Sequence, residues 1–144
     1  GTEIDLMLGA KFDRLHGRPY EGKATVVHVG DGHYVNSGPM KTGVAVETGP
    51  TVVFGIGDPE VRVVVTTHPD APIEPAIFTT NGISLATTRV LGLKGKGHFR
   101  SGFEPHVNQI LLVEGPGVTG SDLTRLPLQY TRRPIWPLDE VEYP

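Results

Sequence analysis

Four basic side chains on a glycine-rich loop have the types and spacing best suited to chemistry, in this case the binding of an anion. They are Lys94, Lys96, His98 and Arg100, with Gly95 and Gly97 between them. Glycines let a backbone approach a ligand closely, and the N-terminus of a helix presents unpaired N–H groups to an anion. The loop is neither a Walker A motif nor a dinucleotide-binding fingerprint, so a solvated basic loop that joins two core elements stays the alternative.

A helix-start pattern follows this loop. Ser101 and Glu104 have the spacing of a capping box, in which the hydroxyl accepts from the Glu104 N–H and the carboxylate accepts from the Ser101 N–H. Pro105 would lie in the first turn, where its missing N–H costs little. The apolar residues 90–93 before the loop are typical of a short buried strand.

This arrangement would place the loop at the carboxyl end of a parallel strand, where open α/β sheets bind ligands. We therefore expect His98 and Arg100, with the backbone around Gly97, to bind a carboxylate, because arginine recognises carboxylates with two hydrogen bonds. The competing hypothesis is that Arg100 pairs with Glu104, one helical turn further along.

The histidines do not match a known metal-binding motif. No His-Glu-x-x-His pair occurs among the six, which are His16, His28, His33, His68, His98 and His106. His28 and His33 flank a predicted hairpin turn, so a two-histidine site is the alternative. The chain has no cysteine, which excludes disulfides, thiolate metal sites and a cysteine nucleophile. We predict no metal site and no catalytic residues in this chain.

The first half of the chain predicts antiparallel strands. Alternating or β-branched runs separated by Gly, Asp and Pro turns occupy residues 4–8, 23–29, 34–35, 44–47, 51–56 and 61–67. Residues 30–33 would turn the second strand directly into the third as a hairpin. The expected result is a meander.

The second half predicts a small β-α-β-α-β unit. One helix would begin at Glu74 with Pro75 in its first position and end at Gly82. Strands at residues 89–94 and 109–114 would enclose the helix after Ser101 and be joined by right-handed parallel crossovers. The fold class expected is therefore α+β with a mixed sheet, formed by residues 1–131 as a single domain.

The last residues, 132–144, predict an extended tail, because prolines remove backbone donors. We expect Trp136 to anchor the tail on an apolar surface. We expect Arg132 or Arg133 to pair with a carboxylate or to reach a substrate cleft.

Composition narrows the functional classes. The chain has 144 residues, which suits one domain, and its net charge of −3 argues against nucleic-acid or anionic-membrane binding. No apolar run is long enough to span a bilayer, and the lack of cysteine is compatible with the cytoplasm, where we expect the protein. The chain opens on strand-like sequence without Met, so we expect a piece of a longer polypeptide.

These motifs together resemble a known family. The residues His98, Phe99, Arg100, Phe103, Glu104 and Pro105, followed by Arg-Arg-Pro-Ile-Trp-Pro-Leu-Asp at 132–139, resemble the C-terminal region of the microcystinase C (MlrC-type) metallopeptidases. Further landmarks in the same order are residues 8–11, 38–40, 75–78 and 82–83. One departure is Gly95, where the family has a serine after the strand lysine.

The resemblance implies a role within a larger enzyme. Members of this family are two-domain, zinc-dependent hydrolases of peptide-like substrates, with metal ligands and catalytic groups in a larger N-terminal domain. This chain would be the accessory C-terminal domain, inactive alone, packing on the missing catalytic domain and shaping the substrate cleft. Zinc is expected in the parent protein, and homo-oligomers are compatible with it. The alternatives are an independent anion or small-molecule binding module and a self-contained hydrolase.

Overall fold

A computed structural model describes residues 1–11, 15–58, 60–115, 120, 122–126 and 128–142. The chain divides into two compact units. The first contains Gly1–Leu6 and Glu21–Ile110, and the second contains Met7–Tyr20 and Leu111–Pro144. They are described separately below.

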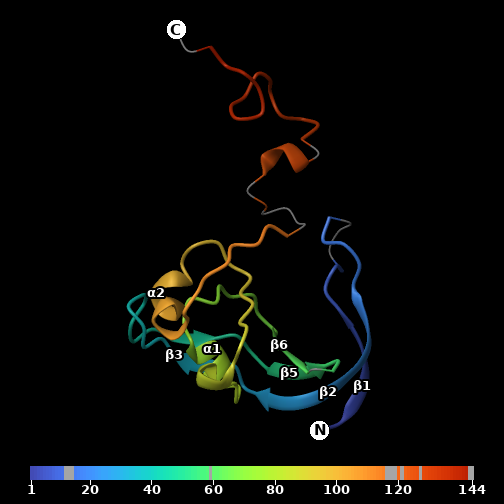
Figure 1. The fold of residues 1–144 in the computed structure, drawn as a ribbon, viewed down its shortest axis with the longest axis vertical. Coiled ribbons are helices and arrows are strands. Elements are labelled where there is room, and N and C mark those ends of the chain that lie inside the picture. The colour runs from blue at the N-terminus through green and yellow to red at the C-terminus, as the bar shows by residue number, and fades with distance from the viewer. Residues whose placement is uncertain (12–14, 59, 116–119, 121, 127, 143–144) are drawn as a thin grey trace. The chain divides into compact units, whose positions relative to one another are not determined.

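The first unit is built on a four-stranded sheet in the order β1-β2-β5-β6 (Figure 1). Its strands are β1 (Glu3–Leu8), β2 (Tyr20–Gly30), β5 (Thr51–Ile56) and β6 (Val61–Thr66). The pairs β2–β5 and β5–β6 are antiparallel, as the alternating sequence predicts. Every second residue of the central strand β5 is buried, and Val53 is fully enclosed.

The predicted hairpin between residues 23–29 and 34–35 is wrong. β3 (His33–Val35) pairs instead with β4 (Ala45–Glu47) in a separate two-stranded sheet, and β2 pairs with β5. The cause is a close approach of two backbones at Gly32, where a Cβ would lie 2.0 Å from the Gly49 carbonyl oxygen. Thr48 closes this contact by donating its N–H to the Gly32 carbonyl oxygen at 2.9 Å.

Two single-turn α-helices pack beside β3. The helix predicted after Pro75 is confirmed as α1 (Ala76–Thr79), and Gly82 ends this segment with a φ of 74°. The second helix, α2 (Arg100–Phe103), continues into the 3-10 turn η2 (Glu104–His106). Another 3-10 turn, η1 (Leu85–Thr87), lies between α1 and α2 in the sequence. A core of Tyr34, Ile77 and Phe103 joins these helices to β3.

The predicted β-α-β-α-β unit does not form in the described residues. Residues 89–94 and 109–114 contain no strand. The helices between these segments have only four residues each. Leu91 and Leu93 pack on the core without joining a sheet. The α+β class and the antiparallel part of the prediction stand, whereas the mixed sheet does not.

The second unit is mostly irregular. Its 3-10 turn η3 (Leu123–Arg125) begins at Asp122, whose carboxylate accepts from the Thr124 N–H at 3.1 Å. The tail is not simply extended, because the N–H groups of Leu138 and Asp139 both donate to the Ile135 carbonyl oxygen at 2.9 Å. The prolines exclude regular structure here, as expected, but they do not prevent a turn.

Candidate functional site

A buried polar corner lies where the loop after β3 meets the start of α1. Glu74 is only 3% exposed, and its carboxylate accepts two hydrogen bonds from that loop. Ser37 Oγ donates to Oε1 at 3.0 Å, and the Gly38 N–H donates to Oε2 at 2.8 Å. Hydrogen bonds to a charged acceptor are among the stronger ones in proteins, so this carboxylate fixes the loop on α1.

Helix α2 packs against the same corner through Gly102. A Cβ on Gly102 would lie 2.2 Å from the Ile73 carbonyl oxygen, and a Cβ on Gly38 would lie 3.9 Å from the Gly102 Cα. The basic loop also approaches this segment, since a Cβ on Gly95 would be 3.9 Å from Pro72 Cγ. The backbone contacts therefore place the loop that precedes α2 beside the segment that contains Glu74.

The four predicted basic residues are all solvent-exposed. Arg100 Nη1 lies 3.5 Å from Glu104 Oε1, and the guanidinium lies 5.7 Å from the centre of the Phe99 ring. The ion pair of the competing hypothesis is therefore present. Within the part of the chain that the structure describes, Lys94, Lys96 and His98 make no ion pair.

Two arguments that favoured anion binding at this loop are wrong. Ser101 does not cap α2 but lies inside it, where its hydroxyl donates to the His98 carbonyl oxygen at 3.1 Å. No strand precedes the loop, so it does not leave the edge of a parallel sheet. What the structure retains is an exposed group of three cations and one histidine, on the loop and at the first residue of α2, beside residues 72–75.

Sequence reasoning missed two buried polar residues near Glu74. The Tyr34 hydroxyl donates to Asp70 Oδ2 at 3.4 Å, and burial, reinforced by the charges of Asp70 and Glu74, raises the pKa of Tyr34 to about 12. Asn36 is 1% exposed, and neither atom of its amide has a partner within the described ranges. The available signal was the alternation of Tyr34 in β3 with Asn36 just after it, since both are buried and Val35 between them is exposed.

The described residues do not bring together a ligand set for zinc. No group of three or more His, Asp or Glu side chains converges anywhere in the ranges that the structure describes. His33 lies near two acids, 3.6 Å from Asp31 and 3.7 Å from Glu47, whereas His28 pairs with Val53 in the β2–β5 ladder. The two-histidine alternative therefore lacks the further ligands that a metal site needs.

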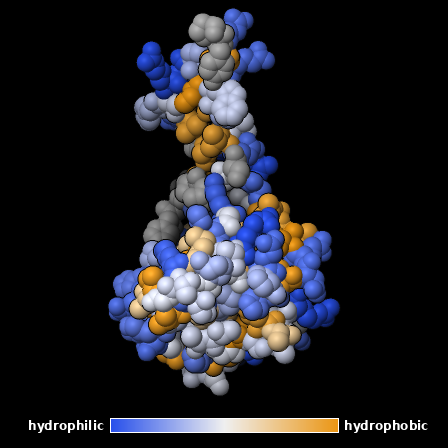
Figure 2. Space-filling view, turned by 90° about the vertical axis from the view of Figure 1, so that its left-hand side faces the viewer, coloured by the Kyte–Doolittle hydropathy of each residue, from blue (hydrophilic) through white to orange (hydrophobic). Residues whose placement is uncertain are grey.

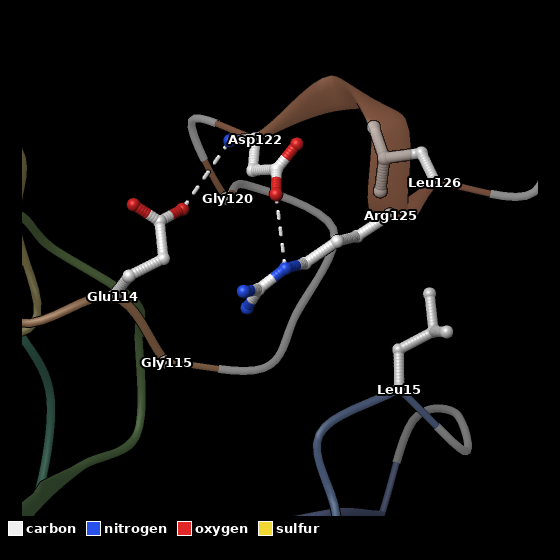
Figure 3. A pocket seen from close by; sticks show the side chains of 7 residues that line it. All are labelled: Leu15, Glu114, Gly115, Gly120, Asp122, Arg125 and Leu126. Carbon is white, nitrogen blue, oxygen red and sulfur yellow. Dashed lines mark hydrogen bonds and ion pairs between the residues drawn. The ribbon is translucent and has the colours of Figure 1, made fainter.

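A pocket of about 270 Å³ occurs in the second unit (Figure 3). The side chain of Arg125 points into it, but its Nε lies 3.0 Å from Asp122 Oδ2, which neutralises the guanidinium. Glu114 adds a second carboxylate and accepts from the Asp122 N–H at 3.4 Å. None of the predicted site residues lines this pocket, whose walls are Leu15, Glu114, Gly115, Gly120, Asp122, Arg125 and Leu126.

The predicted interface residues of the tail behave differently from one another. Arg133 pairs with a carboxylate, as expected, and the partner is Asp139 of the same tail, with 2.6 Å between Nε and Oδ2. Trp136 is 69% exposed, and Arg132 is also exposed. In this chain, therefore, the indole does not pack between apolar surfaces.

The fold and the polar corner define a small, sheet-rich α+β domain without a metal-binding cluster in its described residues. Residues 1–130 match the family described as "MlrC C-terminus", so the chain belongs to that family. The match confirms the resemblance seen in the sequence. It ends before Arg132, Arg133 and Trp136.

The fold is similar to a crystal structure from Mesorhizobium sp. BNC1 whose name is "Putative metallopeptidase". The TM-score is 0.84 over 99% of this chain, with 24% sequence identity, and the chain covers 28% of that relative. At this identity the likeness shows the fold alone. No curated protein matches the chain. Within the described residues, no helix is both long and apolar enough to cross a membrane.

Proposed function

We propose that this chain is the accessory C-terminal domain of a zinc-dependent hydrolase of peptide-like substrates. The observation that carries the proposal is the family match over residues 1–130. The chain packs on a preceding catalytic domain, which supplies the zinc ligands, and it shapes one wall of the substrate cleft. Residues 1–131 act as one functional domain, residues 132–144 as a docking tail, and the parent enzyme works in the cytoplasm.

Within this proposal the loop that carries Lys94, Lys96, His98 and Arg100 faces the cleft. Three exposed cations and an exposed histidine, on the loop and at the first residue of α2, support this role. Arg100 exchanges its exposed Glu104 partner for a substrate carboxylate, because an exposed helical pair stabilises by only about 0.2–0.5 kcal/mol. His98 adds a second donor to the same carboxylate. The tail residues Arg132 and Trp136 contact the catalytic domain.

The kinetics of Arg100→Ala in the full-length enzyme test the binding role. Losing charge-assisted hydrogen bonds of about 1.5–3 kcal/mol lowers kcat/KM by roughly tenfold or more, with near-normal stability. Arg62→Ala is a matched control, because Arg62 is also exposed and pairs with a nearby glutamate, Glu60, at 2.9 Å. Equal kcat/KM for wild type and both variants would exclude a substrate role for Arg100.

A further inference from the structure

Residues 110–113 have the sequence of a strand but pair with no strand among the described residues. Leu111, Leu112 and Val113 are 74%, 73% and 87% exposed. No backbone hydrogen bond involves these three residues within the described part of the chain. Unpaired backbone groups of such a segment can pair with another strand.

The described residues of the second unit form no hydrophobic core. Among the described residues, every buried hydrophobic side chain belongs to the first unit: Ala24, Tyr34, Val53, Ile77, Ile83 and Phe103. Large apolar side chains of the second unit, including Tyr130 and Trp136, are exposed, and Figure 2 shows uncovered hydrophobic surface in orange. Large exposed apolar surfaces are uncommon on a monomer and are typical of sites that contact another surface.

The pattern of the segment indicates what kind of surface covers it. Side chains alternate between the two faces of a strand, so Leu111 and Val113 share one face and Ile110 and Leu112 share the other. Both faces are apolar. Strands that are apolar on both faces are typical of sheets covered on both sides, whereas strands with one solvated face alternate with polar residues.

We propose that residues 110–113 form a β-strand that pairs with the edge of a sheet in the preceding domain of the same polypeptide. This rests on the proposed function, which requires such a domain. The family is described as a C-terminus, and this fold accounts for only 28% of its solved relative, so the relative has ample further chain.

A second copy of this chain is a poorer partner for the strand. The outer strand β1 carries Glu3 and Asp5, both paired with Lys23 of β2, and the opposite outer strand β6 carries Arg62. Charged side chains on outer strands oppose further strand addition. The two outer edges of the four-stranded sheet are therefore protected against the chain's own apolar strand.

Hydrogen exchange in the full-length protein tests the proposal. We expect the amides of residues 111–113 to exchange at least about 100-fold more slowly than unprotected amides, at every protein concentration. Trp136 fluorescence gives a separate readout of domain docking. If the amides of residues 111–113 exchange fast while Trp136 is buried, the strand pairing is wrong and the proposed function stands. If these amides exchange fast and Trp136 is exposed, both the strand pairing and the proposed function are contradicted.

Val113→Asp, with Val90→Asp as the control, tests the same contact by substitution. Val90 belongs to the first unit and is 88% exposed, so its side chain is as exposed in this chain as that of Val113. We expect Val113→Asp to abolish the protection of residues 111–113 and Val90→Asp to preserve it. Protection that appears only in a concentration-dependent dimer would assign the partner strand to a second copy and overturn the proposal.

Discussion

Ser37 and Glu74, 37 positions apart in the sequence, are joined by a 3.0 Å hydrogen bond that ties the loop after β3 to the start of α1. The same carboxylate also accepts from the Gly38 N–H. Glu74 is buried and its two donors are partly exposed, so these bonds are partly shielded from competing water. Within the proposed function, the substrate loop approaches the same segment at Pro72, two residues before Glu74.

Glu74→Ala should lower the free energy of unfolding by about 1–3 kcal/mol, because it leaves two donors without their acceptor. Glu74→Gln should cost less, since its amide can accept from Gly38 and donate to Ser37 Oγ. Urea denaturation of the whole protein measures both. Glu104→Ala is the control, because its exposed pair with Arg100 contributes only about 0.2–0.5 kcal/mol. Equal losses for Glu74→Ala and Glu104→Ala would contradict the role given to Glu74.

Gly102→Ala should destabilise the protein although alanine favours helices. A Cβ there would lie 2.2 Å from the Ile73 carbonyl oxygen, which is backbone and cannot rotate away. Overpacking of this kind costs about 1–3 kcal/mol, more than the roughly 0.8–1 kcal/mol gained in helix propensity. Gly92→Ala meets no atom within 4 Å and should be neutral or slightly stabilising. Thermal unfolding of both variants measures the difference, and a Gly102→Ala protein as stable as wild type would refute the contact.

Local patterns predicted those elements of the fold whose partners are close in sequence. The strands at residues 51–56 and 61–66 follow from alternation and a Gly57-Asp58 turn, and they pair as a hairpin. The pairing of β3 with β4 depends on the approach of Gly32 to Gly49, which no local pattern records. The sequence therefore predicted the positions of these strands, but it predicted the wrong pairing partners for β2 and β3.

The same distinction explains the errors in the second half and at the site. The apolar residues 90–93 and 110–113 have strand composition, but they join no strand in the part of the chain that the structure describes. The basic loop was visible in the sequence. The burial of Glu74 was not, because an acid before a helix usually serves as an exposed cap, and only the tertiary contact with Ser37 and Gly38 reveals its role.

The turn in the tail should depend on pH through Asp139. The hydrogen bond from the Arg133 guanidinium, followed by that from the Ile135 N–H, lowers the pKa of Asp139 below its ordinary value. A lowered pKa means that this stabilisation is complete above the ordinary value and is lost as the pH falls through the lowered one. Arg133→Gln should raise the Asp139 pKa measured by NMR. Arg132→Gln, at the neighbouring exposed arginine, should leave it unchanged, and the same pKa in both variants would rule out the ion pair.

Tyr34 should make the first unit lose stability in strong base. Burial, followed by the charges of Asp70 and Glu74, raises its pKa to about 12, above the ordinary value of about 10. Between these values the folded state binds more protons than the unfolded state, so the free energy of unfolding falls as the pH rises and is unaffected below about pH 10. The loss is on the order of 1–3 kcal/mol. Tyr34→Phe should remove it, together with the tyrosinate absorbance that titrates near pH 12, whereas Tyr130→Phe, at a fully exposed tyrosine, should retain both. A high-pH titration that disappears in Tyr130→Phe instead would show that Tyr34 is not the buried phenol.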